Sequence, residues 1–245
     1  MGRYGRALVK LSGEALMGDR PFGIDPLTLN DLARQIRLAV DEGVEVAVSI
    51  GGGNFWRGAT VAETGMDRAT ADYAGMLGTI MNALALQDAL EKAGVPSRVQ
   101  SALQMPAVAE SFIRRKAIRH MEKGRVILLA AGTGVPYVTT DTGASLHALE
   151  LKCDVLMKAT KVDGIYDQDP QKFPNARRYK TLTFNDAIQN KDIDVMDTAA
   201  LAMAKENNMP VMVFELFKEN NLQKAVDGEN IGTYVSNDVE TVFAE

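Results

Sequence analysis

The sequence has only one cysteine, Cys153, and two histidines among its 245 residues. A single cysteine excludes an internal disulfide, which is typical of proteins from a reducing compartment. The two histidines, His120 and His147, lie far apart and have no neighbouring pattern of metal ligands or of a Ser/His/Asp triad. The sequence therefore gives no indication of a protein-bound metal centre or of a histidine-activated nucleophile.

Long apolar runs and an excess of positive charge are also missing. No apolar run approaches about 18 residues, the length that indicates a membrane span, and the first residues show no signal-peptide or lipid-anchor motif. The net charge of −5 disfavours binding to a nucleic acid duplex, which typically requires a basic stripe. We therefore expect a cytoplasmic protein with no membrane and no nucleic acid partner.

Two common phosphate-binding motifs are absent as well. Gly13 and Gly18 have the glycine spacing of a G-x-x-x-x-G-K-[ST] loop, but Asp19 stands where that loop requires lysine. The segment 132–137 begins as G-x-G-x-x-G and ends on Tyr137 instead of glycine. If this chain binds a nucleotide, another architecture must hold it.

The chain does have three glycine loops that directly follow apolar runs. The loops are residues 12–13, 51–53 and 132–134, after runs at 7–11, 44–50 and 126–131. Such runs suit strands that are buried on both faces of a parallel sheet. Glycines leave backbone N–H groups uncovered, so that a phosphate can approach them closely. Three such loops predict one crevice along one edge of a sheet.

Strand and helix patterns alternate along the whole sequence, which predicts an α/β fold with a mostly parallel sheet and helices on both faces. Ligands of such folds lie beyond the carboxyl ends of the strands. We expect a single domain over residues 1–245, with two lobes possible around the crevice. The expected strands are 6–11, 44–50, 98–101, 125–131, 154–159 and 210–214, followed by a C-terminal hairpin. The expected helices are one from Pro26 to Gly43, one over 67–92, one opened by Pro106, one capped by Asp141 and one near 198–207, with a long polar loop over 160–178.

Lys10 and the triple glycine are the first chemical candidates. At about 4 Å and an effective dielectric near 20, a lysine attracts a phosphate by roughly 4 kcal/mol. Lys10 could instead extend from a strand end into solvent, and the glycines could serve only a tight turn. Arg57 could clamp a phosphate or be a solvated charge.

The remaining candidates each have an ordinary structural alternative. Asp72 could contact a ligand or be a solvated helix residue, while Asp141 and Asp197 could be helix caps. The hydroxyl-rich segment 133–141 suits a second anion or a sugar phosphate at a helix amino terminus, but it could be a plain strand–helix loop. In the loop 160–178, Tyr166 could stack on a base and Asp169 could accept from a sugar hydroxyl, or both could belong to turns.

Several motifs taken together resemble the amino-acid kinase superfamily. They are KLSGE at 10–14, IGGGNFWRG at 50–58 and KATKVDGIY at 158–166. Two further segments, MDRATADYAGM at 66–76 and GTGVPYVTTD at 132–141, are similar to the bacterial UMP kinase (uridylate kinase) branch. The resemblance covers essentially the whole chain.

The resemblance implies a three-layer α/β/α sandwich and a cytoplasmic, allosteric transferase of pyrimidine nucleotide biosynthesis. It implies transfer of the ATP γ-phosphoryl group to UMP, giving ADP and UDP, with Mg²⁺ bound to ATP and no metal site of the protein itself. The expected acceptor-binding part is N-terminal and the ATP-binding part is C-terminal. The implied partners are ATP and UMP, further copies in a homohexamer, GTP as an activator and UTP as an inhibitor.

The resemblance also assigns residues. For catalysis they are Lys10, Asp141 and Asp197. For ATP they are Lys10, Leu11, Ser12, Gly13, Gly53, Arg57, Thr160, Tyr166 and Asp169. For UMP they are Gly52, Asp72, Thr133, Gly134, Val135, Pro136, Tyr137, Val138, Thr139 and Thr140, with Val135 standing where the family commonly has asparagine. The segment linked to allosteric GTP is Gly18, Asp19, Arg20, Pro21, Phe22 and Gly23.

We expect Lys10 to neutralise charge on the transferred group, with Asp197 orienting Lys10 or the metal shell. We expect Gly52 to turn toward the acceptor phosphate and Gly53 toward ATP. Two alternative functions are open: a kinase of a small carboxylate or carbamate, and a nucleotide-binding or storage assembly without turnover.

Overall fold

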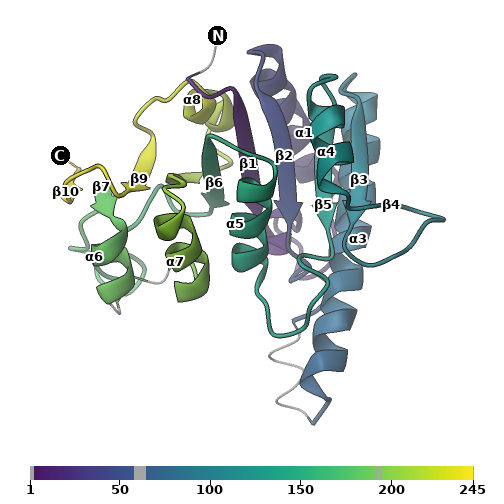
Figure 1. The fold of residues 1–245 in the computed structure, drawn as a ribbon. Coiled ribbons are helices and arrows are strands. Elements are labelled where there is room, and N and C mark those ends of the chain that lie inside the picture. The colour runs from purple at the N-terminus through teal and green to yellow at the C-terminus, as the bar shows by residue number, and fades with distance from the viewer. Residues whose placement is uncertain (1–2, 58–64, 191, 194, 245) are drawn as a thin grey trace.

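The computed structural model describes residues 3–57, 65–190, 192–193 and 195–244. Its strands form one sheet in the order β10-β7-β9-β8-β6-β1-β2-β5-β3-β4 (Figure 1). Neighbours are parallel except for the pairs β8–β9 and β7–β10. The strands are β1 (Arg6–Leu11), β2 (Glu45–Ile50), β3 (Ser97–Ser101), β4 (Glu110–Ser111), β5 (Val126–Ala130), β6 (Val155–Thr160), β7 (Tyr179–Thr183), β8 (Val211–Glu215), β9 (Gly232–Ser236) and β10 (Val242–Phe243).

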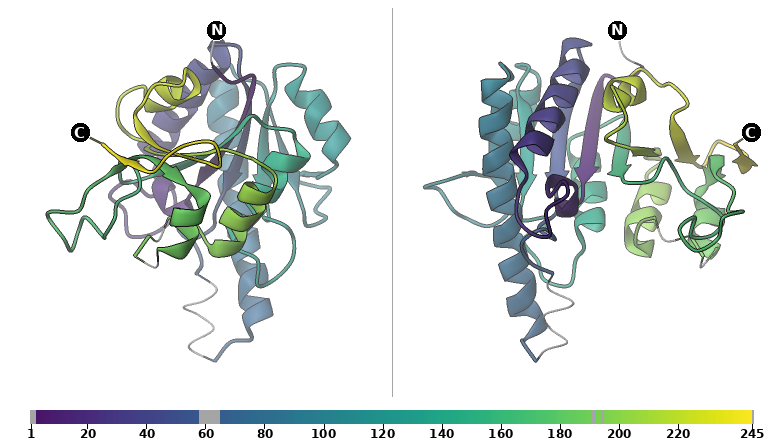
Figure 2. Two further views of the ribbon diagram at one scale, coloured as in Figure 1. Left: turned by 60° about the vertical axis from the view of Figure 1, so that its left-hand side comes forward. Right: turned by 180° about the vertical axis from the view of Figure 1, so that it is seen from behind.

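Helices cover both faces of this sheet, so the expected α/β/α sandwich is confirmed (Figures 1 and 2). One face carries α1 (Pro26–Asp41), α3 (Arg68–Lys92) and α8 (Asn221–Val226), with the short 3-10 helix η1 (Gly13–Leu16) after β1. The opposite face carries α4 (Arg114–Met121), α5 (Thr140–Glu150), α6 (Phe184–Gln189) and α7 (Thr198–Glu206). None of the helices within the described ranges combines the length and the apolarity that a bilayer crossing needs.

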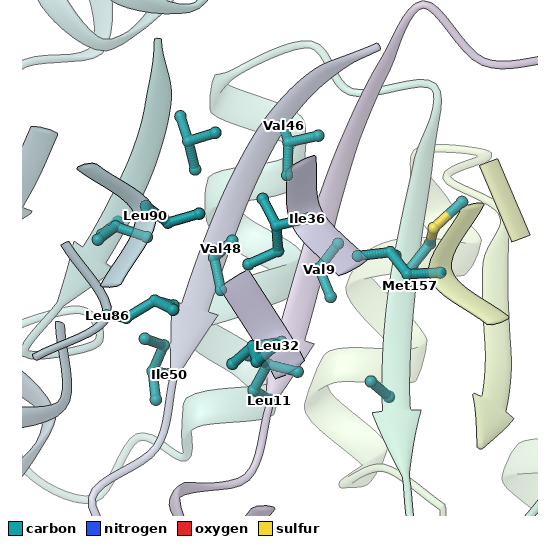
Figure 3. Packing of buried hydrophobic residues seen from close by; sticks show 14 of the residues in the cluster. Val9, Leu11, Leu32, Ile36, Val46, Val48, Ile50, Leu86, Leu90 and Met157 are labelled. Atoms are coloured by element: carbon teal, nitrogen blue, oxygen red, sulfur yellow. The ribbon is translucent and has the colours of Figure 1, made fainter. Parts of the chain in front are cut away.

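The core lies in two layers because successive strand residues point to opposite faces. Val9 and Val48 face α1, where they join Leu32 and Ile36 (Figure 3). Leu8, between Ala7 and Val9 in β1, belongs to the other layer, under α4 to α7. Each large aliphatic side chain buried in this way contributes roughly 1.5–3 kcal/mol. The sheet centre is therefore the most firmly anchored part of the fold, and the candidate residues begin at its carboxyl edge.

Local sequence signals explain where the two longest helices begin. Asp25 caps α1 by accepting a hydrogen bond from the backbone N–H of Thr28 at 2.9 Å, and Pro26 occupies the first helical position. Asp67 caps α3 in the same way, with the N–H of Thr70 at 2.8 Å. The expected limits of both helices are confirmed. The amino-terminal half of α3 extends past the carboxyl edge of the sheet (Figure 2).

Three expectations about secondary structure are wrong. Pro106 opens no helix, because the chain forms a turn there and then adds β4 to the sheet before α4 begins at Arg114. The C-terminal strands form no hairpin: β9 pairs with β8 and β7, and β10 pairs with β7. Asp141 is not a cap, since Thr139 caps α5 and accepts from the N–H of Thr142 at 3.1 Å.

Candidate active site

The carboxyl ends of β1, β2 and β5 border a cavity of about 400 Å³. Its lining brings together residues from all three glycine loops and from the first turns of α3. The expected site residues found in this lining are Lys10, Ser12, Gly13, Gly52, Gly53, Arg57, Asp72, Thr133, Val138, Thr139 and Thr140. The single crevice expected from the three loops is therefore present.

A second cavity of about 910 Å³ lies beside the loop that follows β6. Thr160, Tyr166 and Asp169 line it, together with Lys158. These three are the expected ATP residues of the C-terminal part. The other expected ATP residues, among them Lys10 and Gly53, line the first cavity together with the expected acceptor residues. Lys158 lines the second cavity, and Lys10 lines the first.

The first two glycine loops touch backbone to backbone. A Cβ on Gly13 would lie 2.5 Å from Asn54 Oδ1, 2.6 Å from the carbonyl oxygen of Gly51 and 2.8 Å from the nitrogen of Gly53. Position 13 therefore requires glycine for the close approach of the two loops, whether or not a ligand also contacts Gly13. Leu11, just before Ser12, is fully buried, and its carbonyl oxygen accepts a hydrogen bond from the N–H of Gly51 at 2.9 Å. Contact of Leu11 with ATP stays a prediction.

The missing side chain of Gly52 has a packing role that the sequence did not predict, while contact of Gly52 with the acceptor phosphate stays a prediction. The side of Gly52 that lacks a Cβ faces α3: an added Cβ would overlap the carbonyl oxygen of Gly75 and lie 3.1 Å from the nitrogen of Thr79. Gly53, by contrast, has only the Glu14 side chain near that position, with Oε1 at 3.6 Å. The missing side chain at Gly52 thus permits helix packing, and only at Gly53 does it leave space in the crevice.

Two lysines share one carboxylate at the base of the crevice. Lys10 Nζ lies 2.7 Å from Asp141 Oδ1, and Lys158 Nζ lies 2.7 Å from Asp141 Oδ2. The side chains of Lys10, Asp141 and Lys158 are only 8%, 14% and 16% exposed. Three charges of which two are positive leave one net positive charge at the point where strands β1 and β6 end.

Sheet register explains why the two lysines meet. β1 and β6 are parallel neighbours, and Lys10 stands opposite Lys158 in their pairing. Both side chains therefore point to the α5 face, where Asp141 occupies the first turn of α5. We did not predict a role for Lys158 from the sequence. The repeated pattern Lys-x-Ser/Thr at 10–12 and 158–160 was the signal that could have found it.

Asp197 has other partners than the one expected. It caps α7 through the N–H of Ala200 at 3.0 Å, and it accepts hydrogen bonds from the hydroxyls of Thr142, at 2.8 Å, and Thr139. Burial raises the pKa of Asp197, but the hydrogen bonds outweigh burial and hold that pKa below its ordinary value. The expected contact with Lys10 is made by Asp141 instead, while a role near a metal shell stays a prediction.

Asp72 joins α3 to the hydroxyl-rich loop. Its Oδ2 accepts from the backbone N–H of Tyr137 at 2.9 Å, and its Oδ1 lies 2.9 Å from Arg68 Nε. Tyr137 has a positive φ of 68° and an exposed side chain. Asp72 is therefore more than a solvated helix residue, because it holds the backbone of the segment expected to bind the acceptor.

The segment 133–140 leads directly into the amino terminus of α5, where free N–H groups suit an anion. Thr133, Val138, Thr139 and Thr140 line the crevice. Gly134, Val135, Pro136 and Tyr137 do not belong to that lining, and Val135 is 54% exposed. The contacts of the segment with UMP stay a prediction.

Tyr166 and Asp169 both make local bonds in the loop after β6. Tyr166 donates its hydroxyl to Asp163 Oδ1 at 2.6 Å, and burial together with this carboxylate raises the pKa of Tyr166 to about 12. Asp169 accepts from the N–H of Gln171 at 2.9 Å, which is the expected turn chemistry of an Asp-Pro pair. Turn formation does not exclude contact with a nucleotide, because both residues line the larger cavity.

Arg57 and the segment 18–23 lie beside the crevice. Arg57 forms an ion pair with Glu14, and it lines the crevice. Gly18 and Asp19 line a separate cavity of about 610 Å³ that is rich in carboxylates. Binding of GTP there stays a prediction. Gly58, from the second family motif, lies outside the described residues.

Binding of a Mg²⁺ ion that would arrive with ATP stays a prediction. Within the described ranges, no cluster of three or more His, Cys, Asp or Glu residues could hold a metal. The carboxylates of Glu14 and Asp72, which line the crevice, pair with Arg57 and Arg68. Asp141 is engaged by the two lysines, and Asp197 is engaged by threonine hydroxyls. Mg²⁺ commonly keeps several waters and binds substrate phosphates with few protein ligands.

The arrangement of parallel sheet, glycine loops and paired lysines is that of a phosphoryl-transfer site. Residues 5–215 match the amino acid kinase family, so the chain belongs to that family. The chain is similar to a UMP kinase from Bacillus anthracis, with 36% identity, a TM-score of 0.95 and 99% coverage of both chains. It is also similar to a UMP kinase from Ureaplasma parvum, with 38% identity, a TM-score of 0.89 and coverage of 96% of this chain and 99% of that one. A uridylate kinase from Archaeoglobus fulgidus shares 25% identity with a TM-score of 0.72, over 96% of this chain and 100% of its own.

Proposed function

We propose that this protein is a UMP kinase, which transfers the γ-phosphoryl group of ATP to UMP and releases ADP and UDP. The observation that carries the proposal is the cluster of Lys10, Asp141 and Lys158 between the two cavities. The similarity to UMP kinases over the full length of the chain supports the choice of UMP as the acceptor. We further propose one domain over 1–245, with the acceptor bound by its N-terminal part and ATP by its C-terminal part.

The chemical problem at this site is the repulsion between two anions. The phosphate of UMP is already ionised near neutral pH, so its oxygen needs little help from a general base. Catalysis therefore depends on positioning and on stabilisation of negative charge. Lys10 and Lys158 supply two positive charges, and the backbone N–H groups of the glycine loops supply further donors that cost no rearrangement.

Asp141 keeps the two lysines in place. Without a carboxylate between them, two ammonium groups on neighbouring strands would repel one another and turn away. Each lysine is bound to a different oxygen of Asp141, so both ammonium groups have fixed positions before any substrate arrives. Lys158 is further held by the carbonyl oxygen of Val195. When it is bound with ATP, Mg²⁺ supplies additional positive charge on the nucleotide phosphates.

We also propose assembly into a homohexamer, with GTP as an activator and UTP as an inhibitor. An exposed apolar stripe on α3 supports contact between copies. Tyr73, Leu77 and Met81 are spaced by four residues along this helix, and their exposed fractions are 44%, 48% and 52%. Side chains four residues apart share one helix face.

The test of the proposed function compares several acceptors. The purified protein is supplied with ATP and Mg²⁺, and ADP release is measured with UMP, CMP, dTMP, N-acetylglutamate and carbamate. Turnover with UMP alone is expected. Turnover with N-acetylglutamate or carbamate would favour a carboxylate or carbamate kinase. Tight binding of nucleotides without turnover of any acceptor would favour a storage or sensor assembly.

Replacing Asp141 by asparagine is expected to lower both activity and stability. The variant leaves two buried lysines without their counter-charge, which costs about 3 kcal/mol in the free energy of unfolding. The misplaced lysines should lower kcat by roughly tenfold or more. Urea unfolding and steady-state kinetics measure the two effects.

The matched control for this variant is Asp88→Asn. Asp88 pairs with Lys92 on the exposed side of α3, at 2.5 Å. Exposed pairs contribute about 0–1 kcal/mol, so this control should change neither quantity noticeably. Equal effects of the two variants on stability and kcat would show that the pairing of Asp141 with Lys10 and Lys158 contributes to neither.

A further inference from the structure

One face of α3 holds the glycine loops after β2 and β5. Gly78 lets the helix approach the first loop closely, because a Cβ on Gly78 would lie 3.3 Å from the carbonyl oxygen of Gly52. The next two polar residues on the helix, Thr79 and Asn82, are buried, with 3% and 0% exposure. They lie three residues apart, so they project from the same side of the helix.

Thr79 binds the loop after β5. Its hydroxyl accepts a hydrogen bond from the backbone N–H of Ala131 at 2.6 Å and donates one to the carbonyl oxygen of Met76 at 2.7 Å. Ala131 has a positive φ of 64°, which is unfavourable for a residue with a side chain. The bond from Thr79 therefore holds Ala131, the residue just before this glycine loop, in a conformation that it does not prefer by itself.

Asn82 binds the loop after β2. Its amide donates to the carbonyl oxygen of Gly51 at 2.8 Å, and it exchanges two hydrogen bonds with the amide of Asn54, at 2.7 and 2.9 Å. Asn54 in turn donates to the carbonyl oxygen of Gly23 at 3.0 Å. Buried amides with all partners in place hold one geometry, because any shift leaves a donor or an acceptor without a partner.

We propose that Thr79 and Asn82 are positioning residues for phosphoryl transfer, which fix the separation of the two glycine loops through the backbone of Ala131 and Gly51. This inference rests on the proposed function. Thr79 lines the crevice, but its hydroxyl is engaged by the backbone of Met76 and Ala131, so the role does not require that it bind a substrate. Thr79 and Asn82 act because both project from one rigid helix, α3. Thr79 holds the backbone next to the loop 132–134, which leads into the acceptor segment, and Asn82 holds the loop 51–53, which lies next to Lys10 and Gly13.

This role predicts a particular kinetic signature. Both loops can still contact their own ligand when the attachment to α3 is lost, so binding of each substrate is expected to change little. Alignment of the two phosphates depends on the separation of the loops, and misplacement by about 1 Å can cost 100-fold in rate. A loss in kcat without a comparable rise in KM is therefore expected.

The experiment uses the pair Thr79→Val and Thr79→Ser in the full-length protein. Valine keeps the shape of threonine and removes the hydroxyl, whereas serine keeps the hydroxyl and removes a methyl group. Thr79→Val is expected to lower kcat by about 10- to 100-fold, with KM for ATP and UMP within about threefold of the original values. Thr79→Ser should retain most of kcat. Equal kinetics for the valine and serine variants would overturn the proposal.

A second readout does not depend on activity. Hydrogen exchange of the Ala131 N–H is expected to be slow in the unchanged protein and in Thr79→Ser, and to be at least tenfold faster in Thr79→Val. Unchanged exchange in the valine variant would contradict the attachment itself. If the unchanged protein does not phosphorylate UMP, the proposed function fails, but the exchange measurement still tests the attachment. If Thr79→Val does not fold, Thr79→Ala replaces it with the same expected outcomes.

Gln35→Leu is the control for a loss of stability alone. Gln35 is fully buried on α1 and donates to the carbonyl oxygen of Leu216 at 2.9 Å, away from the glycine loops. This variant should be less stable to urea with kcat unchanged. A fall in kcat equal to that of Thr79→Val would show that general destabilisation, and not loop position, explains the effect.

Discussion

Replacing Lys10 by alanine is expected to lower kcat for UMP phosphorylation by about 100- to 1000-fold, the scale for loss of one preorganised charge donor. Lys10 is buried at the crevice and is held 2.7 Å from Asp141, so its charge is in place before the reaction begins. A water molecule carries no net positive charge, so it cannot replace the ammonium group of Lys10 at this position. Steady-state kinetics with saturating ATP and UMP measures the loss.

The structure makes this prediction more specific, because Asp141 still has Lys158 as a partner in the variant. One carboxylate and one lysine then remain, so the charges in the cluster balance and the protein should fold normally. Lys92→Ala is a suitable control, since Lys92 is exposed on α3 and pairs only with Asp88 among the ion pairs of the described residues. A loss of less than about threefold for Lys10→Ala would remove the catalytic role.

The second large effect is expected at Gly52, where even alanine should abolish measurable turnover. A Cβ would overlap the carbonyl oxygen of Gly75, which is backbone and cannot rotate away. Either α3 or the loop 51–53 must therefore shift, and overpacking of this kind typically costs 1–3 kcal/mol. We expect a variant that folds with lower stability and lacks activity, as circular dichroism, urea unfolding and an ADP-release assay would show.

Gly5→Ala provides the comparison for this substitution. A Cβ on Gly5 would lie 3.4 Å from Asp154 Oδ2, an ordinary contact at the opposite end of β1 from the crevice. Its activity should be unchanged. Retained turnover in Gly52→Ala would mean that the loop and helix can separate without consequence, which would also weaken the positioning role inferred for Thr79.

The sequence predicted the parts of the site that depend on short segments. Glycines after buried strands indicated the crevice, because in parallel sheets the carboxyl ends of neighbouring strands share one edge. The positions of Lys10, Asp72 and Thr139 in or beside the crevice agree with that expectation. Lys10 and Thr139 could be found because local order places them at a strand end and at a helix start, whereas Asp72 was assigned through the resemblance to the family.

Residues whose partners come from distant segments could not be predicted. The role of Lys158 depends on the register of β1 with β6, which no local pattern reveals. For the same reason, Asp197 was assigned the contact that Asp141 makes. Gly52 was interpreted from its own loop, although its neighbour is a helix more than twenty residues later. At the C-terminus, β10 pairs with β7 across the sheet edge and not with the preceding strand.

The pairing of β1 with β6 has a consequence for the order in which the protein folds. Lys10 and Lys158 belong to strands that are far apart in sequence but adjacent at the sheet centre, so their approach requires closure of a long loop. Contacts of this kind generally form slowly during folding. A nascent chain that has not yet reached Lys158 has only half of the paired charge, however well its first helices have formed. Onset of phosphoryl transfer should therefore mark the completion of the sheet, which makes catalytic activity a stricter probe of the native state than helix content.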